Sequence, residues 1–244
     1  MKNISQDMRK RRRKMQKAGR IIGIVAIVIL IFAAIIASMN NKPSNSDKVW
    51  DDRTTIGNPE AKNYFIIYSD LVCPYCLAFE NAIIENEEEF KQYIEENDVL
   101  FEVRVSDFLY EYGESNPINS RYSAIATYCA RDEGKFWDYY NKAITTVWND
   151  YFKNEGKSGF VALNKNSQDY WTKIGEGLDL SDDFKTCIKE ERPLDEIIKN
   201  AAKTYDLIDS GLPAFKLNKY SPPGFSPNGT WEDVKAYFEA GLNS

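Results

Sequence analysis

The stretch that decides the fold is residues 64–76, YFIIYSDLVCPYC. Its first part, Tyr64–Tyr68, is a short aromatic and β-branched run with the composition of a buried strand. A helical pattern begins at the motif Cys73–Cys76 and continues to about Glu95. Two cysteines separated by two residues therefore stand where a buried strand gives way to a helix.

The spacing and position of the two cysteines favour thiol–disulfide exchange. Cys73 is expected at the helix N-terminus, where unpaired N–H groups and the helix dipole stabilise a thiolate. Pro74 suits the first helical turn, because its missing N–H would have no intrahelical partner there. Cys76 follows one turn on and closer to the protein, where it can attack a mixed disulfide and release the substrate. We therefore predict that Cys73 is the nucleophile and Cys76 the resolving thiol.

Two other interpretations of the cysteine pair are a zinc half-site and a purely structural pair. A structural zinc site needs four ligands, and the 244-residue sequence has neither a histidine nor a second Cys-x-x-Cys. The missing histidine also excludes Ser-His-Asp and Cys-His nucleophiles and any histidine metal site. The redox interpretation is favoured by the strand–helix context and by an N-terminal apolar segment, described below, that predicts export. For this interpretation we expect no metal or other cofactor.

The rest of the chain predicts an α/β fold with a helical insertion. Val99–Val105 alternates well enough to be a second strand, and Ala214–Leu217 is a candidate third strand. Between them, Pro117–Leu207 is largely helical, and Thr230–Asp233 has the form of a capping box that opens a last helix. The apolar spacing is clearest in residues 121–131, 135–148 and 181–205. A sheet interrupted by an insertion at about residues 108–208 follows from this order.

The N-terminus predicts a single transmembrane helix. Residues 21–38, IIGIVAIVILIFAAIIAS, are 18 residues without a charge, and a helix of that length spans ~27 Å. Residues 1–20 carry nine lysines or arginines, so the positive-inside rule keeps them in the cytoplasm and places the rest outside. The alternative is a cleaved signal peptide, although its apolar region usually has only about 7–15 residues. We expect a retained anchor at residues 21–39.

The part of the chain beyond the anchor is predicted to be a linker and one domain. Residues 40–58 are polar, contain Pro43 and several Ser and Asn, and are typical of a tether. Residues 59–244 form the expected domain, and most of the acidic residues behind the net charge of −6 lie beyond residue 20. A domain with this excess of acidic residues is a poor candidate for binding nucleic acid.

The motifs together resemble one family. Phe65–Asp70, Cys73–Cys76, the fragment Glu133–Trp137 and Gly211–Pro213 are similar to the DsbA-like branch of the thioredoxin superfamily. The resemblance covers roughly residues 56–244. It implies a thioredoxin-like fold with a helical insertion, a thiol:disulfide oxidoreductase activity, and a cis-proline opposite the dithiol.

The resemblance also assigns roles to residues around the dithiol. By position the cis-proline is Pro213, and Leu212 presents its backbone to an extended substrate segment. Strongly oxidising members of the family have histidine where this sequence has Tyr75. A neutral phenol gives less electrostatic help to the Cys73 thiolate. We therefore expect a potential of about −180 to −230 mV, the range of protein disulfide isomerase and the glutaredoxins.

Three further residues have two interpretations each. Asp70 either tunes proton transfer from Cys76 or is a loop or cap residue of the kind aspartate favours in turns. Cys129 and Cys187, both in the helical insertion, are either two small buried hydrophobes or a structural disulfide. Outside the cytoplasm the second interpretation is natural, because the active-site pair leaves these two as partners.

The leading functional hypothesis is an oxidase that donates its disulfide to exported cysteine-containing proteins and is reoxidised by a quinone-linked membrane partner. The alternative in the same class is a disulfide reductase or isomerase fed by a membrane electron donor. A third hypothesis is a non-catalytic binding module, in which the scaffold merely displays a peptide groove.

Overall fold

The computed structural model describes residues 51–153, 156–207, 211–222 and 229–243. The predicted basic segment 1–20, the predicted anchor 21–39 and most of the predicted linker lie outside these ranges. Within the described residues, no helix is both long enough and apolar enough to cross a bilayer.

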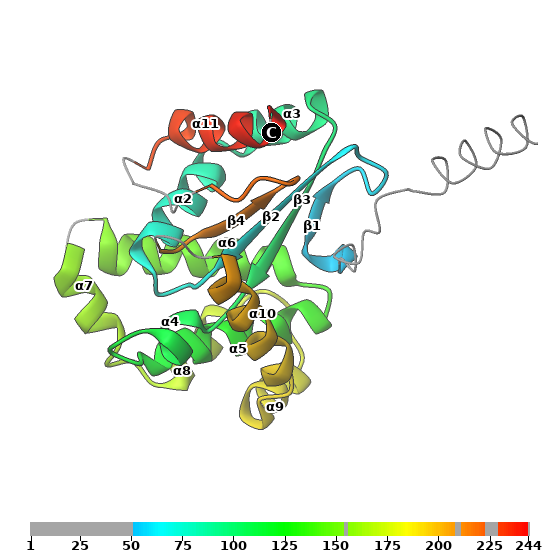
Figure 1. The fold of residues 1–244 in the computed structure, drawn as a ribbon. Coiled ribbons are helices and arrows are strands. Elements are labelled where there is room, and N and C mark those ends of the chain that lie inside the picture. The colour runs from blue at the N-terminus through cyan, green and yellow to red at the C-terminus, as the bar shows by residue number, and fades with distance from the viewer. Residues whose placement is uncertain (1–50, 154–155, 208–210, 223–228, 244) are drawn as a thin grey trace, which may run out of the picture. The chain divides into compact units, whose positions relative to one another are not determined.

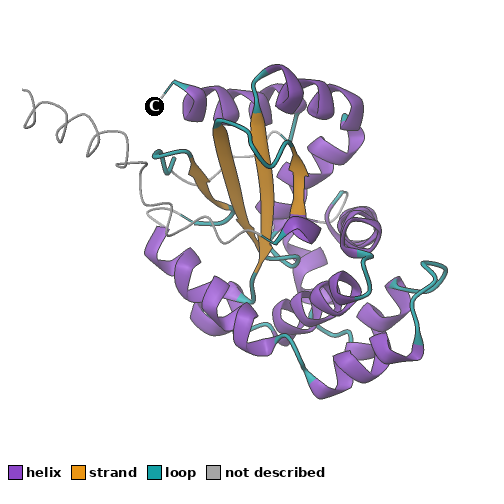
Figure 2. Ribbon diagram, turned by 90° about the vertical axis from the view of Figure 1, so that its right-hand side faces the viewer, coloured by secondary structure: helices purple, strands orange, loops and turns teal. Residues whose placement is uncertain are grey.

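The centre of the described part is a four-stranded mixed sheet in the order β1-β3-β2-β4 (Figures 1 and 2). Strands β2 (Asn63–Ser69) and β3 (Val99–Val105) run parallel, with Phe65 opposite Phe101. Strand β4 (Ala214–Leu217) pairs antiparallel with β2. All three strands expected from the sequence are therefore confirmed. The two central strands are buried on both faces, which explains why their sequences are nearly continuous apolar runs.

The fourth strand corrects the predicted linker. Asp52–Thr54 forms a 3₁₀ turn (η1) and Thr55–Gly57 forms β1, which pairs antiparallel with β3. The polar segment 40–58 therefore does not continue as a tether to residue 58. A strand of three residues is too short to show an alternation of apolar and polar residues in its sequence. It is defined by its pairing with β3.

Helices surround the sheet (Figure 1). Those outside the insertion are α2 (Pro74–Glu85), α3 (Glu87–Glu96) and α11 (Trp231–Leu242). The insertion between β3 and β4 consists of α4 (Phe108–Tyr112), α5 (Ile118–Asp132), α6 (Phe136–Val147), the π-helical turn η2 (Trp148–Phe152), α7 (Gly156–Leu163), α8 (Gln168–Ile174), α9 (Asp182–Glu190) and α10 (Leu194–Leu207). The predicted capping box of Thr230 with Asp233 is present at the start of α11.

Two helical patterns that look continuous in the sequence are each broken in the structure. The pattern after Cys73 is interrupted at Asn86, whose φ of −124° and ψ of 43° are not helical. The pattern in residues 181–205 is interrupted after Glu190, where Glu191 takes a left-handed conformation and Pro193 follows. Proline disfavours helical geometry in the residue before it, so the second helix begins only after Pro193.

One face of the sheet packs on α2 and α11 through phenylalanine rings. Phe79 of α2 lies 5.0 Å from Phe215 of β4, and Phe238 of α11 lies 5.5 Å from Phe65 and 5.8 Å from Phe101. Ring pairs at such distances contribute about 0.5–1.5 kcal/mol beyond the burial of their area. This cluster fixes α2, and with it the cysteine motif at its N-terminus, against the sheet.

A disulfide joins two helices of the insertion. Cys129 of α5 and Cys187 of α9 are bonded, with their Cα atoms 5.8 Å apart and a separation of 58 positions in the sequence. Both cysteines are buried. Of the two interpretations given above, the structure contains the disulfide, which links α9 to the core helix α5.

We predict that replacing both cysteines, Cys129→Ala with Cys187→Ala, lowers the free energy of unfolding by about 4 kcal/mol. The reason is that the unfolded chain gains the entropy of a loop of this length, as the chain-entropy account gives it. Denaturant unfolding followed by circular dichroism measures the change. The variant Cys73→Ala with Cys76→Ala, unfolded in the same buffer, keeps the bridge and is the control. Equal midpoints for the two double variants would contradict the prediction.

Candidate active site

The cysteine motif lies where β2 ends and α2 begins. Cys73 is the N-cap residue of α2, with extended backbone (φ −80°, ψ 118°), and Pro74 is the first helical residue. The Cys73 N–H donates to the Asp70 carbonyl at 2.9 Å, and the Cys73 carbonyl accepts from the Leu77 N–H at 3.0 Å. The Cys73 side chain makes no capping hydrogen bond, so its sulfur is free to use the positive end of the helix for a developing charge.

The two thiols differ in exposure. Both are unbonded; Cys73 is 5% exposed and Cys76 is fully buried. Burial, the contact with Cys73 and the charge of Glu80 raise the pKa of the Cys76 thiol well above its ordinary value. Cys76 therefore keeps its proton at neutral pH, and the thiol that a partner can reach is Cys73. This asymmetry is the one that the assigned roles of nucleophile and resolving thiol require.

The loop before β4 completes the surroundings of the dithiol. Leu212 packs with Cys73 and Cys76 in one small apolar cluster, against which Phe108 and Leu109 also pack. The Leu212–Pro213 peptide bond is cis. Because β4 pairs with β2, and β2 leads into the motif, the sheet itself brings these distant residues together. Tyr75, between the two cysteines in the sequence, is 49% exposed.

Asp70 is a buried clamp under the motif. Its Oδ1 accepts from the Val72 N–H at 3.1 Å, and its Oδ2 accepts from the Leu109 N–H at 2.9 Å and the Ser120 hydroxyl at 2.6 Å. Burial raises the pKa of Asp70 to about 6, against the lowering effect of these donors. Both oxygens are used to connect the motif loop with α4 and α5. These hydrogen bonds give Asp70 a loop-forming role, while its part in proton transfer stays a prediction.

One residue beside the dithiol was missed by the sequence interpretation. Glu80 of α2 is only 3% exposed and follows Cys76 by four residues, one helical turn. The Tyr140 hydroxyl of α6 donates a hydrogen bond to it. A signal was available: Cys76 was expected to face the protein, and the residue four positions later faces the same way.

The fold and this dithiol define the class. A Cys-x-x-Cys at the N-terminus of a helix that follows a central strand, with a cis-proline directly after a residue that packs on the two cysteines, is the arrangement of a thioredoxin-like domain. The chain belongs to the thioredoxin family, since the sequence model of the family described as thioredoxin matches residues 50–239. A comparison with curated protein sequences gives no match.

Solved structures share the fold. BdbD from Bacillus subtilis, in its oxidised form, superposes with a TM-score of 0.55 at 15% identity, covering 78% of this chain and 93% of that one. Wolbachia pipientis alpha-DsbA1 gives 0.54 at 16% identity, covering 78% and 90%. A protein-disulfide isomerase from Novosphingobium aromaticivorans gives 0.51 at 16% identity, covering 78% and 97%. The described domain thus has structural matches among DsbA-type oxidoreductases.

We predict that Asp70→Asn lowers the free energy of unfolding by about 1–3 kcal/mol, because the NH2 group that replaces one carboxylate oxygen cannot accept from donors that stay buried. Ser120→Ala removes only one of the three donors and is expected to cost about 1 kcal/mol. Denaturant unfolding of both variants measures the difference. An Asp70→Asn protein as stable as the wild type would show that the clamp has no energetic role.

The cost of Asp70→Asn is also expected to depend on pH. The pKa of Asp70 is higher in the folded protein than its ordinary value of 3.8, so the folded state binds more protons between pH 4 and 6. The wild type therefore loses this contribution to stability as pH rises through that window, and the asparagine variant does not. The gap between them is expected to be largest near pH 4 and to narrow by pH 6.

Proposed function

We propose that this protein is an extracytoplasmic thiol:disulfide oxidoreductase that introduces disulfides into exported proteins. The observation that carries the proposal is the asymmetric dithiol: Cys73 caps α2 and is 5% exposed, whereas Cys76 is fully buried and its pKa is raised. The likeness of the fold to DsbA-type and disulfide-isomerase structures supports it. The buried disulfide in the insertion is what an oxidising compartment permits.

The proposed reaction starts from the oxidised Cys73–Cys76 pair. A client thiolate attacks the Cys73 sulfur, forms a mixed disulfide and displaces Cys76. A second client thiolate then attacks the client sulfur of that mixed disulfide, which leaves the client with a disulfide and the enzyme with two thiols. Leu212 and Pro213 present the backbone beside which the client segment lies. A quinone-linked membrane partner then takes two electrons from the Cys73–Cys76 dithiol and re-forms its disulfide.

The residue Tyr75 bears on a second candidate function, in which electrons flow from the dithiol to the client. Its exposed phenol stands between the cysteines and supplies no positive charge to the Cys73 thiolate. A weaker oxidant is better suited to isomerase or reductase chemistry, with electrons supplied by a membrane donor. The non-catalytic binding module differs from both, because it predicts that Cys73→Ala leaves function intact.

The proposed location follows from the N-terminus. The apolar residues 21–38 hold the protein in the cytoplasmic membrane, with the basic residues 1–20 inside and the catalytic domain outside. This orientation places the dithiol where exported proteins and a membrane redox partner can both reach it.

We predict that the full chain catalyses insulin reduction and that Cys73→Ala abolishes it, because the other unbonded thiol among the described residues, Cys76, is fully buried. In cells, Cys76→Ala is expected to accumulate mixed disulfides through Cys73 with exported proteins, in the membrane fraction. Diagonal gels and mass spectrometry identify the trapped partners. The double variant Cys73→Ala with Cys76→Ala is the control that cannot trap. Trapping of cytoplasmic proteins alone would refute the location, and full function of Cys73→Ala would refute the enzyme.

We predict a reduction potential of about −180 to −230 mV, measured by equilibration with glutathione buffers. Tyr75→His is expected to raise it by about 30 mV or more, because a nearby imidazolium stabilises the Cys73 thiolate. Tyr75→Phe keeps the ring without the hydroxyl and is the matched control for shape. A wild-type value near −120 mV, that of a strong oxidant, would overturn the expectation.

A further inference from the structure

Helix α4 forms a wall beside the dithiol. Its residues Phe108 and Leu109 pack against the cluster of Cys73, Cys76 and Leu212. A client segment that is bonded to Cys73 and lies along the Leu212 backbone therefore lies beside α4 as well. The position of this short helix then affects how well the client fits.

The outer part of α4 continues this wall with exposed aromatic rings. The Tyr112 ring lies 5.3 Å from that of Phe108 and 4.8 Å from that of Tyr205 on α10. Tyr112 is 46% exposed and Tyr205 is 60% exposed. Cysteine is among the most buried residue types in folded proteins, so the cysteines of a client commonly have apolar neighbours. Exposed aromatic rings suit such neighbours.

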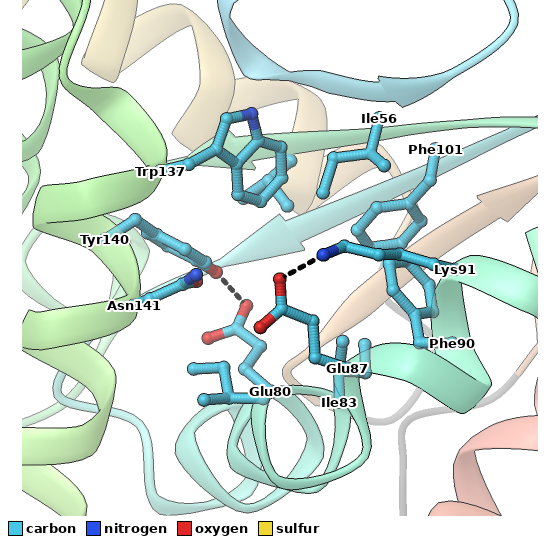
Figure 3. A pocket seen from close by; sticks show the side chains of 12 residues that line it. Ile56, Glu80, Ile83, Glu87, Phe90, Lys91, Phe101, Trp137, Tyr140 and Asn141 are labelled. Carbon is cyan, nitrogen blue, oxygen red and sulfur yellow. Dashed lines mark hydrogen bonds and ion pairs between the residues drawn. The ribbon is translucent and has the colours of Figure 1, made fainter.

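The cavity beside α2 is not an alternative site for those apolar side chains. It has a volume of about 50 Å³, and its walls include Ile83, Phe90 and Trp137 (Figure 3). A cavity that holds benzene measures about 150 Å³. The cavity beside α2 is therefore large enough for water but too small for an aromatic side chain of a client.

Burial does not fix the position of α4. None of its five residues is buried, and so short a helix is not stable by itself in water. Backbone N–H groups at its start donate to Asp70 and Ser120. The side chain of Arg121, on α5, contacts the helix and its cap at three further points. The position of the wall therefore depends on polar contacts, of which Arg121 makes a large share.

The guanidinium group of Arg121 contacts Asp107, Tyr110 and Glu111 together. Its Nε donates to Asp107, the N-cap residue of α4, at 2.8 Å, and a terminal N–H donates to the Glu111 carboxylate. Its central carbon lies 4.2 Å from the centre of the Tyr110 ring. Burial raises the pKa of Asp107, and the contact with Arg121 lowers it. Lysine cannot reproduce this arrangement, because it lacks the planar fork that donates in two directions while it stacks on a ring.

We propose that Arg121 is a positioning residue of the dithiol: it holds α4 beside Cys73 and thereby sets how tightly a client segment binds there. The inference rests on the proposed oxidoreductase function and adds a residue to it. Arg121 acts through α4 and not on the sulfur atoms. Its replacement is therefore expected to weaken client binding and to leave the exchange step itself unchanged.

Arg131, on the same helix α5, provides a matched control. It is also paired with a carboxylate, that of Glu196 at 2.6 Å, and its guanidinium carbon lies 4.4 Å from the centre of the Tyr128 ring. Its side chain is 6% exposed, against 15% for Arg121. The contacts that the structure describes for Arg131 lie outside α4. A substitution there removes the same kinds of contact and leaves the wall in place.

The test is single-turnover oxidation of two synthetic dithiol peptides by the oxidised full chain. The two cysteines of one peptide have leucine and phenylalanine as neighbours, and those of the other have serine. Wild type, Arg121→Lys and Arg131→Lys are mixed with increasing peptide, quenched with acid, alkylated and counted by mass for free thiols. Lysine retains a positive charge beside Asp107, so the buried carboxylate keeps a cation.

The expected result is a change in binding without a change in the exchange rate. Arg121→Lys raises the half-saturating concentration of the apolar peptide about tenfold and keeps the limiting rate. Arg131→Lys behaves as the wild type with both peptides. The serine peptide does not distinguish the three proteins, because it has no apolar side chain for the wall.

A second variant covers the case in which Arg121→Lys folds poorly. Tyr110→Leu removes the ring under the guanidinium group and keeps the carboxylate partners of Arg121, so it is expected to raise the same concentration by a smaller factor, about threefold. Equal effects of Arg121→Lys and Arg131→Lys, or a limiting rate lowered with both peptides, would indicate a general structural role and overturn the inference. An unchanged half-saturating concentration in Arg121→Lys and Tyr110→Leu would overturn it as well.

Failure of the proposed function gives a different result. A wild type that oxidises neither peptide would overturn the oxidoreductase proposal itself. A wild type that oxidises both peptides, with the half-saturating concentrations of Arg121→Lys, would overturn the role of Arg121 alone.

Discussion

The central position of strand β2 is the constraint on which the rest of the structure depends. It pairs with β3 on one side and β4 on the other, and it runs directly into the cysteine motif. The β4 pairing brings Leu212 and Pro213, more than 130 residues later, to the dithiol. The end of β2 also fixes where α2 begins. The position of the reactive sulfur therefore depends on the backbone hydrogen bonds of the sheet, together with the phenylalanine contacts that hold α2 against it.

The features encoded locally were predictable from the sequence. The strands at residues 64–68, 99–105 and 214–217 and the cap at Thr230 follow from composition and spacing, because each is determined by its own residues. Strand β1 was not predictable, since three residues in a polar segment become a strand only through β3. The ends of the helical patterns at Asn86 and Glu191 were not predicted, for a related reason. Apolar spacing continues across them, although the backbone does not.

The candidate site shows the same division. The roles of Cys73 and Pro74 follow from their place at a helix start, and the resemblance to a family supplied Pro213 and Leu212. Two of the three hydrogen bonds that the Asp70 carboxylate accepts come from Leu109 and Ser120, which are distant in sequence and are brought to it only by the fold. Glu80 could have been found from its spacing to Cys76, but its partner Tyr140 comes from the insertion, 60 residues later. Sequence periodicity shows which way a side chain faces but not what it meets there.

The absence of histidine from the sequence gives these carboxyl groups their significance. Imidazole is the side chain whose ordinary pKa lies in the physiological range, so in a protein without it the side chains that titrate near neutral pH are those whose pKa is shifted. Burial is the means available here: it raises the pKa of Asp70 to about 6 and that of Glu80 to about 8. Asp70 uses both oxygens to hold the motif loop, which leaves little capacity for moving a proton. Glu80 is held by the Tyr140 hydroxyl and by Ser69, and both contacts lower its pKa against the effect of burial.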